Sequence, residues 1–184
     1  MKIYIMGPSG SGTTTLGKKL SRELSIAQED SDNLFWENTN PPFTTQTKIE
    51  KLYELFNDFT KQERFILSGD VLNWGLPRKE LLNCFTHLIY LYVPWEIREK
   101  RIREREIHRF GNRILNSGDM YKTHEGFIEW ASHYESGRKA GRNMLSQKNF
   151  IDHFRKQNKN VLEIEEPLEL IELTNHAISF LNNQ

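Results

Sequence analysis

The feature that most constrains this chain is a cluster of glycine and hydroxyl residues directly after its first apolar segment. The short run 2–6 leads into Gly7-Pro8-Ser9-Gly10-Ser11-Gly12-Thr13-Thr14. An apolar run that ends at such a cluster is typical of a buried strand followed by a turn. Leu16, Leu20 and Leu24 then recur every four residues, which predicts a helix over residues 12–24. The chain therefore opens with a strand, a glycine-rich loop and a helix.

The spacing of this loop matches GxxxxGK[ST], the Walker A pattern, except that Thr13 stands where the pattern has lysine. Glycines let successive N–H groups point into one concavity, and the following helix adds the positive end of its dipole. Phosphate oxygens fit that concavity, and Thr14 supplies a hydroxyl for Mg²⁺. A hydrogen bond to a charged group contributes about 1.5–3 kcal/mol, so arginines elsewhere can compensate for the absent lysine. An ordinary Gly/Ser turn is the alternative interpretation.

The rest of the chain alternates between strand-like and helix-like segments. Four further strands are expected, at residues 26–30, 65–67, 87–93 and 161–164. Helical periodicity separates them, and Pro167 suits the first turn of a closing helix. This alternation predicts an α/β protein with the three-layer α/β/α P-loop NTPase fold. The expected architecture is a five-stranded parallel sheet with helices on both faces, in one domain over residues 1–184.

Composition restricts the classes of partner. Twenty-five Lys and Arg residues balance 25 Asp and Glu residues, so the net charge indicates no nucleic-acid partner. Cys84 is the only cysteine, which excludes an intrachain disulfide and favours a reducing compartment. The first apolar run is too short for a signal peptide or a membrane span. We therefore expect a cytoplasmic protein without a membrane partner; the sequence leaves its oligomeric state open.

With the phosphate loop in place, the chain resembles the adenylate-kinase and shikimate-kinase branch of P-loop kinases over nearly its whole length. The string GSGTTTL at residues 10–16 is similar to that of a bacterial group of kinases or AAA-type ATPases. Archaeal cytidylate kinases also carry GTTT at this point, which implies that threonine in the lysine position is compatible with phosphoryl transfer. The resemblance implies ATP as co-substrate, Mg²⁺ as cofactor and a small-molecule acceptor. It also implies an acceptor-binding segment at about 33–63 and a lid at about 108–126.

Asp30-Ser31-Asp32, after the second expected strand, resembles the acidic DxD motif of shikimate kinase. The resemblance implies that Asp30 lies beside Mg²⁺ or acts as a base, and that Asp32 orients the acceptor. A carboxylate can accept the proton of an attacking hydroxyl, so the carry-over is chemically sound. A solvated acidic turn is the alternative interpretation.

The acceptor-binding segment contains two aromatic candidates, Trp36 and Phe43, on either side of a double proline. They can stack a flat substrate, although packing in a hinge is the commoner use of aromatic residues. Arg78, just beyond the segment, is a candidate substrate contact. Because few other basic residues lie there, a neutral hydroxylated acceptor stays as open as a nucleotide.

Arg101 and Arg105 lie four residues apart on the helix expected after Pro94. They match the pair that adenylate kinases place between nucleotide and flap, and guanidinium forks suit phosphate oxygens. We expect Arg98 and Arg103, by contrast, to be solvated and paired with neighbouring glutamates for small gains.

Arg138 and Arg142 repeat the four-residue spacing on what we expect to be the helix after the flap. The resemblance implies that they reach the transferring phosphoryl group. Ser68-Gly69-Asp70 follows the third strand, with aspartate and glycine in the opposite order from adenylate kinases. That departure leaves the role of Asp70 open.

Together these residues predict an ATP-dependent kinase of a small molecule, with nucleotides and nucleosides among the candidate acceptors. One alternative is a P-loop ATPase or nucleotide-binding regulatory protein that acts on a protein partner. Another is a degenerate P-loop protein that binds nucleotide weakly. A GTPase switch is disfavoured, since Asn158-Lys159-Asn160 lacks the aspartate of an NKxD string. The six histidines show no spacing typical of a metal site.

Overall fold

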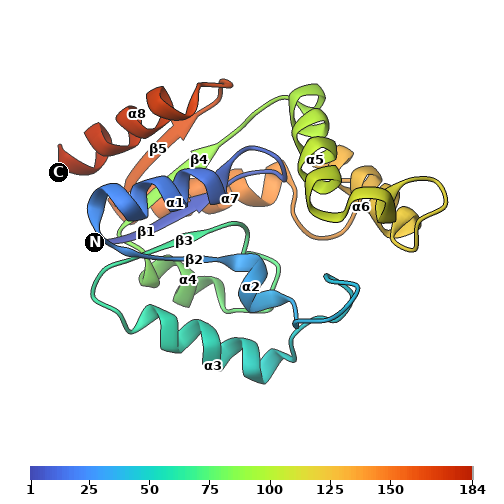
Figure 1. Cartoon of the computed structure of the whole chain (residues 1–184). Helices are drawn as coiled ribbons and strands as arrows, with labels where there is room; N and C mark the ends of the chain where they lie inside the picture. The colour runs from blue at the N-terminus through green and yellow to red at the C-terminus, as the bar shows by residue number, and fades with distance from the viewer. Residues whose placement is uncertain (184) are drawn as a thin grey trace.

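A computed structural model describes residues 1–183, and its centre is a five-stranded sheet (Figure 1). The strands are β1 (Lys2–Met6), β2 (Ala27–Asp30), β3 (Phe65–Ser68), β4 (His87–Leu91) and β5 (Asn160–Ile164). Their order is β2-β3-β1-β4-β5, and every neighbouring pair is parallel. The predicted strands are therefore confirmed, and so is the parallel sheet.

Helices cover both faces of this sheet. On one face, α1 (Thr13–Leu24) and α8 (Leu170–Asn182) pack against the side chains of Ile3 and Ile5. On the other, α3 (Ile49–Thr60), α4 (Arg78–Cys84) and α7 (Met144–Arg155) pack around Tyr4 and Met6. Successive side chains of a strand point to opposite faces, so β1 supplies both cores. The continuous apolar runs in the sequence follow from burial on both sides.

Four further elements complete the chain beside the sheet. The short α2 (Ser31–Phe35) follows β2, while α5 (Trp95–Phe110), the 3₁₀ turn η1 (Gly111–Ile114) and α6 (Tyr121–Ser132) lie to one side (Figure 1). Ile102 of α5 packs with Ile128 and Ala131 of α6. The predicted lid at about 108–126 consists of the end of α5, η1, a loop and the start of α6. Within residues 1–183, every helix falls short of the length and apolarity needed to cross a membrane.

Two sequence predictions of local structure are wrong. Arg138 and Arg142 lie in the loop between α6 and α7, not on a helix. Gly137 and Gly141 have φ values of 64° and 99°, so the chain turns there in a conformation that favours glycine. Pro167 is likewise outside the closing helix, because α8 begins three residues later and its first backbone bond runs from Leu173 N–H to the carbonyl of Glu169.

Candidate functional site

The glycine-rich loop joins β1 to α1 at the point where the strand order reverses. β1 pairs with β3 on one side and β4 on the other, so the loop sits in a crevice at the carboxyl edge of the sheet. Ser11 N–H donates to the carbonyl of Pro8 at 3.1 Å, and Leu16 N–H donates to that of Gly12 at 2.9 Å as α1 begins. The first amides of a helix have no intrahelical acceptor and are available to an anion.

Two glycines allow this loop to pack directly on neighbouring backbone. A Cβ added to Gly7 would lie 2.2 Å from the carbonyl oxygen of Leu91. Gly10 has a φ of 83°, and a Cβ there would lie 2.8 Å from the carbonyl oxygen of Arg98. The loop is therefore shaped by the end of β4 and by α5, as well as by its own sequence.

We expect Gly7→Ala to lower the free energy of unfolding by about 1–3 kcal/mol, since the added methyl overlaps main-chain atoms that cannot rotate away. Urea denaturation measures this change. The matched control is Gly126→Ala in α6, where a Cβ meets nothing within 4 Å. That control should leave stability unchanged or raise it by about 0.5–1 kcal/mol, because alanine favours a helix interior. Equal stability of Gly7→Ala and the wild type would contradict the close packing of the loop.

The predicted metal residues, Thr14 and Asp30, are brought together by the fold. Thr14 Oγ1 donates to Asp30 Oδ2 at 2.5 Å, which joins α1 to the end of β2. The other oxygen, Oδ1, accepts the N–H of Asp32 at 3.0 Å and caps α2. No cluster of three or more His, Cys, Asp or Glu residues able to hold a metal occurs in the described part of the chain. A hydroxyl beside one carboxylate fits Mg²⁺, which completes its shell with phosphate oxygens and water.

Asp32, the predicted acceptor residue, lies two positions further on in α2. Its side chain is exposed, and partial desolvation by nearby protein atoms raises its pKa. The positive charges of Arg142, Arg105 and Arg109 oppose the shift, while Asp30 adds to it. The charges of the three arginines therefore act on Asp32. A carboxylate with a raised pKa accepts a proton more readily.

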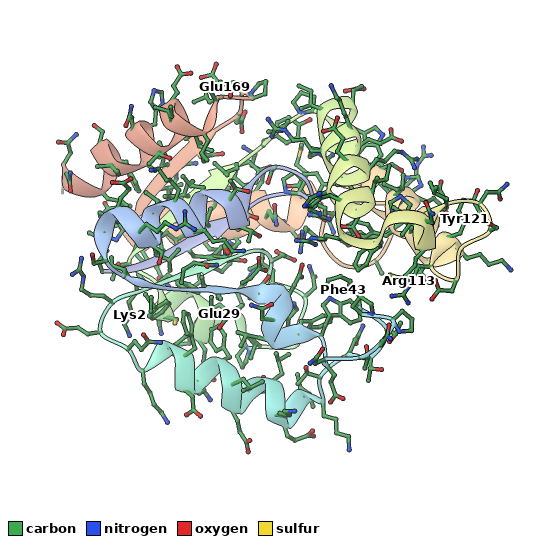
Figure 2. The ribbon with its side chains drawn as sticks, in the orientation of Figure 1. Lys2, Glu29, Phe43, Arg113, Tyr121 and Glu169 are labelled. Carbon is green, nitrogen blue, oxygen red and sulfur yellow. The ribbon has the colours of Figure 1, made fainter. Side chains whose placement is uncertain are left out.

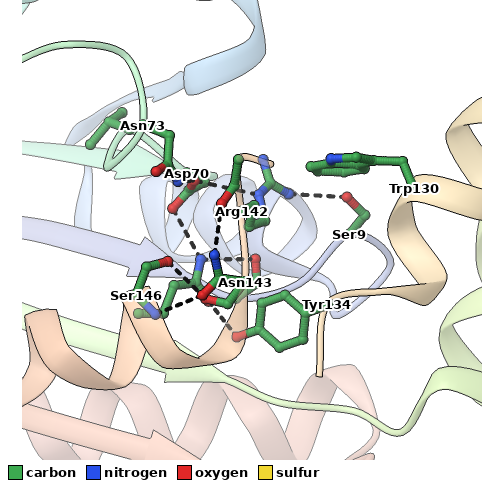
Figure 3. Close-up of polar contacts among 12 residues, drawn as sticks. Ser9, Asp70, Asn73, Trp130, Tyr134, Arg142, Asn143 and Ser146 are labelled. Carbon is green, nitrogen blue, oxygen red and sulfur yellow. Dashed lines mark hydrogen bonds and ion pairs between the residues drawn. The ribbon is translucent and has the colours of Figure 1, made fainter. Parts of the chain in front are cut away.

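Arg142 reaches the phosphate loop from the far side of this cleft (Figure 3). Its Nη1 donates to Ser9 Oγ at 3.1 Å, and its Nε lies 3.7 Å from Asp70 Oδ2. The guanidinium carbon is 5.9 Å from the ring centroid of Trp130. The side chain is only 17% exposed, and within residues 1–183 its Nε makes no hydrogen bond. A positive group is thus held at the very loop that carries Thr13 in place of lysine.

Arg98 contradicts its sequence prediction, because it is fully buried and not solvated. Its guanidinium lies between the rings of Trp95 and Tyr134, at 5.1 and 5.4 Å from their centroids. It donates to three backbone oxygens and pairs with one carboxylate, those of Val93, Ser9, Ala131 and Glu135. Arg98 therefore ties the phosphate loop to the end of α6. Arg103 behaves as expected, with partly exposed pairs to nearby glutamates.

The other predicted arginines are less closely joined to the loop. Arg101 lines a cavity of about 260 Å³, together with Ser11, Gly12 and the segment 166–170 before and at the start of α8. Arg105 Nε donates to Glu106 Oε1 at 2.8 Å while its charge acts on Asp32. The guanidinium of Arg138 is exposed and meets no polar partner in the residues described, and that of Arg78 donates to the carbonyl of Ser146 on α7 at 3.5 Å.

The predicted aromatic pair lies in the acceptor-binding segment, which contacts the lid through Asn40. The ring of Trp36 meets that of Phe43 edge to face, with centroids 6.2 Å apart, and Phe43 is 37% exposed. Figure 2 shows Phe43 and Arg113 close to one another. Arg113 Nη2 donates to Asn40 Oδ1 at 3.3 Å and to Asp119 Oδ2 at 2.7 Å. The lid and the acceptor-binding segment are therefore in contact.

Sequence reasoning missed the polar groups that surround Asp70. This carboxylate is buried and accepts a hydrogen bond from Gln147 Nε2 at 3.0 Å. The sequence does contain a pattern that indicates helix α7, since Phe150, Ile151 and Phe154 follow Gln147 at helical spacing. Nothing in that pattern indicates that the residue opening the buried stripe reaches the phosphate loop.

The sequence matches the family model described as AAA domain over residues 3–113. It is 34% identical to the uncharacterized protein YqaC of Bacillus subtilis (strain 168), over 98% of this chain and 97% of that protein. It is 27% identical to a shikimate kinase of Acinetobacter baumannii (strain AYE), over 79% of this chain and 88% of that protein. A cytidylate kinase of Sulfolobus acidocaldarius is 29% identical, over 58% of this chain and 62% of that protein.

Two solved structures have the same fold. A deoxyadenosine kinase from M. mycoides with bound dATP superposes with a TM-score of 0.55 at 16% identity, over 99% of each chain. A shikimate kinase from Bacteroides thetaiotaomicron gives a TM-score of 0.53 at 20% identity, over 100% of this chain and 99% of that one. With the family match and the loop geometry, these likenesses lead to one conclusion: the chain belongs to the AAA-domain family of P-loop proteins and has the fold of the P-loop kinases.

Proposed function

We propose that this protein is an ATP-dependent kinase that phosphorylates a hydroxyl of a small molecule bound beside Asp32. The observation that carries the proposal is the convergence of three features at one edge of the sheet. These are the phosphate loop, the Thr14–Asp30 pair and the guanidinium of Arg142. Phosphoryl transfer depends on positioning and charge stabilisation, which these groups provide. The shikimate-kinase and cytidylate-kinase relatives support the reaction class and leave the acceptor open.

In this mechanism the loop amides hold the phosphates of ATP, and the 260 Å³ cavity beside Arg101 receives the base. Thr14 and Asp30 would hold Mg²⁺, which neutralises phosphate charge when bound. The acceptor oxygen forms a bond to the γ-phosphorus as the bond to the β–γ bridging oxygen breaks. Asp32 takes the proton of that hydroxyl, and ADP leaves with the released pair of electrons. Arg142 faces the negative charge that spreads over the transferring group.

The contact between lid and acceptor-binding segment supports a closed site for this reaction. Arg113 bridges Asn40 on one side and Asp119 on the other. Closure of such a lid excludes water and so favours transfer to the acceptor over hydrolysis.

Incubation with γ-labelled ATP, Mg²⁺ and a panel of acceptors tests the proposal. The panel should contain nucleosides, nucleoside monophosphates and neutral or carboxylated polyhydroxy compounds. We expect label on at least one acceptor and little free phosphate. Binding of ATP without transfer to any acceptor would count against a kinase. Steady hydrolysis that a protein stimulates would favour an ATPase that acts on a protein partner.

Thr14→Val is expected to lower kcat about a hundredfold and to weaken the apparent affinity for Mg²⁺, since valine keeps the shape but has no hydroxyl. It also removes the only side-chain donor to Asp30 Oδ2 within residues 1–183. Initial rates measured over a Mg²⁺ titration check this. Thr123→Val, on the exposed face of α6, is the matched control and should behave as the wild type. An unchanged Mg²⁺ dependence of Thr14→Val would remove Thr14 from the metal site.

A further inference from the structure

A chain of hydrogen-bonded, buried polar side chains lies beside the phosphate loop, and Figure 3 shows its part between Tyr134 and Asp70. The hydroxyls of Tyr90 and Tyr134 are 2.9 Å apart, and that of Tyr134 donates to Gln147 Oε1 at 2.6 Å. Gln147 Nε2 then donates to Asp70 Oδ1 at 3.0 Å. The four residues come from β4, the turn after α6, the first turns of α7 and the loop after β3. Burying polar groups costs free energy unless each has a hydrogen-bond partner. A connected chain of such groups therefore fixes the positions of its side chains.

The direction of these hydrogen bonds orients the amide of Gln147. Because Tyr134 donates to its oxygen, the amide nitrogen faces Asp70 and, at 3.5 Å, the carbonyl of Gly7. The Gln147 amide has no titratable proton, so it can donate this hydrogen bond to Asp70 at any pH and brings no negative charge of its own beside the carboxylate. Gln147 is fully buried and touches both the phosphate loop and the carboxylate that follows β3.

Asp70 in turn contacts Arg142. The second oxygen, Oδ2, lies 3.7 Å from Arg142 Nε, an atom that is buried and has no hydrogen bond in the described part of the chain. Nε therefore lies beside Asp70 while Nη1 donates to Ser9 Oγ, so the guanidinium is fixed between Asp70 and the phosphate loop. Arg142 lies in a loop, and its backbone stands only two residues before α7. A loop residue of this kind needs side-chain anchors to keep one position.

We propose that Gln147 is a positioning residue of the transfer site, and that through Asp70 it holds the Arg142 guanidinium against the phosphate loop. The proposal rests on the kinase function proposed above, since it assigns Arg142 to the phosphates of ATP. It explains why a polar side chain occupies a fully buried position on the apolar face of α7.

Replacing the amide with an acid makes this role measurable. In Gln147→Glu, a protonated carboxyl still donates to Asp70, whereas an ionised one repels it and competes for Arg142. The pair of carboxyls shares one proton at low pH and loses it as the pH rises. Burial keeps the phenol pKa values of Tyr4 and Tyr134 raised, so these hydroxyls stay protonated throughout. Asp70 and Tyr134 contact Gln147 directly. The titratable and charged groups that contact or act on these two partners are Arg142, Tyr90 and Tyr4, and Lys148 lies over the Tyr90 ring.

The test is calorimetric titration of Mg-ATP into wild type and Gln147→Glu at about pH 5.5 and about pH 8.5, which bracket the raised pKa of a paired carboxyl. Each dissociation constant is divided by that of the wild type at the same pH. For Gln147→Glu, we expect this ratio to be near one at the lower pH and at least about ten at the higher pH. The matched control is Gln157→Glu, in the exposed turn after α7. Its binding should equal that of the wild type at both pH values.

Tyr134→Phe provides a second arm, because it removes only the hydroxyl that orients the amide. We expect ATP binding about threefold to tenfold weaker than wild type. If Gln147→Glu does not fold, unchanged binding by Tyr134→Phe overturns the proposal. If it folds, equal ratios at the two pH values overturn it and leave the kinase function standing. Failure of the wild type to bind Mg-ATP would overturn both.

Discussion

Arg142→Ala is expected to lower kcat for phosphoryl transfer about a thousandfold, because a guanidinium that faces the transferring phosphoryl group contributes at least about 10³ in rate. The loop that it contacts has Thr13 where the Walker A pattern has lysine. Arg142, which donates to Ser9 Oγ, therefore supplies a positive charge beside the loop. Single-turnover rates with the acceptor found in the panel measure the loss. Arg142→Lys should recover only part of it, since an ammonium cannot face Ser9 and Asp70 as a fork does.

A matched control and a rescue sharpen this prediction. Arg64→Ala removes an exposed arginine that precedes β3, and its rate should equal that of the wild type. Adding Thr13→Lys to Arg142→Ala restores the lysine of the Walker pattern and should recover about tenfold or more of the rate. A wild-type rate for Arg142→Ala, or a rescue that works equally well in the wild-type background, would contradict the idea that Arg142 replaces the lysine.

Arg98→Met is expected to lower the free energy of unfolding by about 3–5 kcal/mol, since each buried carbonyl left without its donor costs about 1–3 kcal/mol. The substitution leaves the carbonyls of Val93, Ser9 and Ala131 without their donor. It also removes a charge that lies between two aromatic rings. Thermal and urea denaturation measure the loss, and ATP binding should weaken as well because the backbone of Ser9 is released.

Arg103→Met is the matched control on the same helix. Its guanidinium makes two ion pairs at 2.9 Å, yet its side chain is 39% exposed where that of Arg98 is fully buried. Such surface pairs contribute at most about 1 kcal/mol. A loss for Arg98→Met no larger than that for Arg103→Met would show that burial of Arg98 contributes little to stability.

The comparison of Arg98 with Arg103 also shows where prediction from sequence ends. Both residues lie on a helix rich in Arg and Glu, and the sequence offers each of them local glutamate partners. Only Arg103 uses a partner on its own helix, Glu99. Arg98 turns to the phosphate loop and the end of α6, with Ser9 as far as 89 residues away in the sequence. Periodicity reports which face a residue occupies and carries no information about distant partners.

The sequence by itself determined the five strands and the glycine-rich loop, while Asp30 became a candidate metal residue beside Thr14 only through the resemblance to shikimate kinase. The strands and the loop depend on local patterns, namely apolar runs and closely spaced glycines. Only the tertiary structure decided which positive group serves the loop and what holds it. Arg142 lies 133 residues from Ser9, and Gln147 lies 77 from Asp70. Contacts at such distances arise from helix packing and from loops without periodicity, so they exist only once the layers have assembled around the sheet.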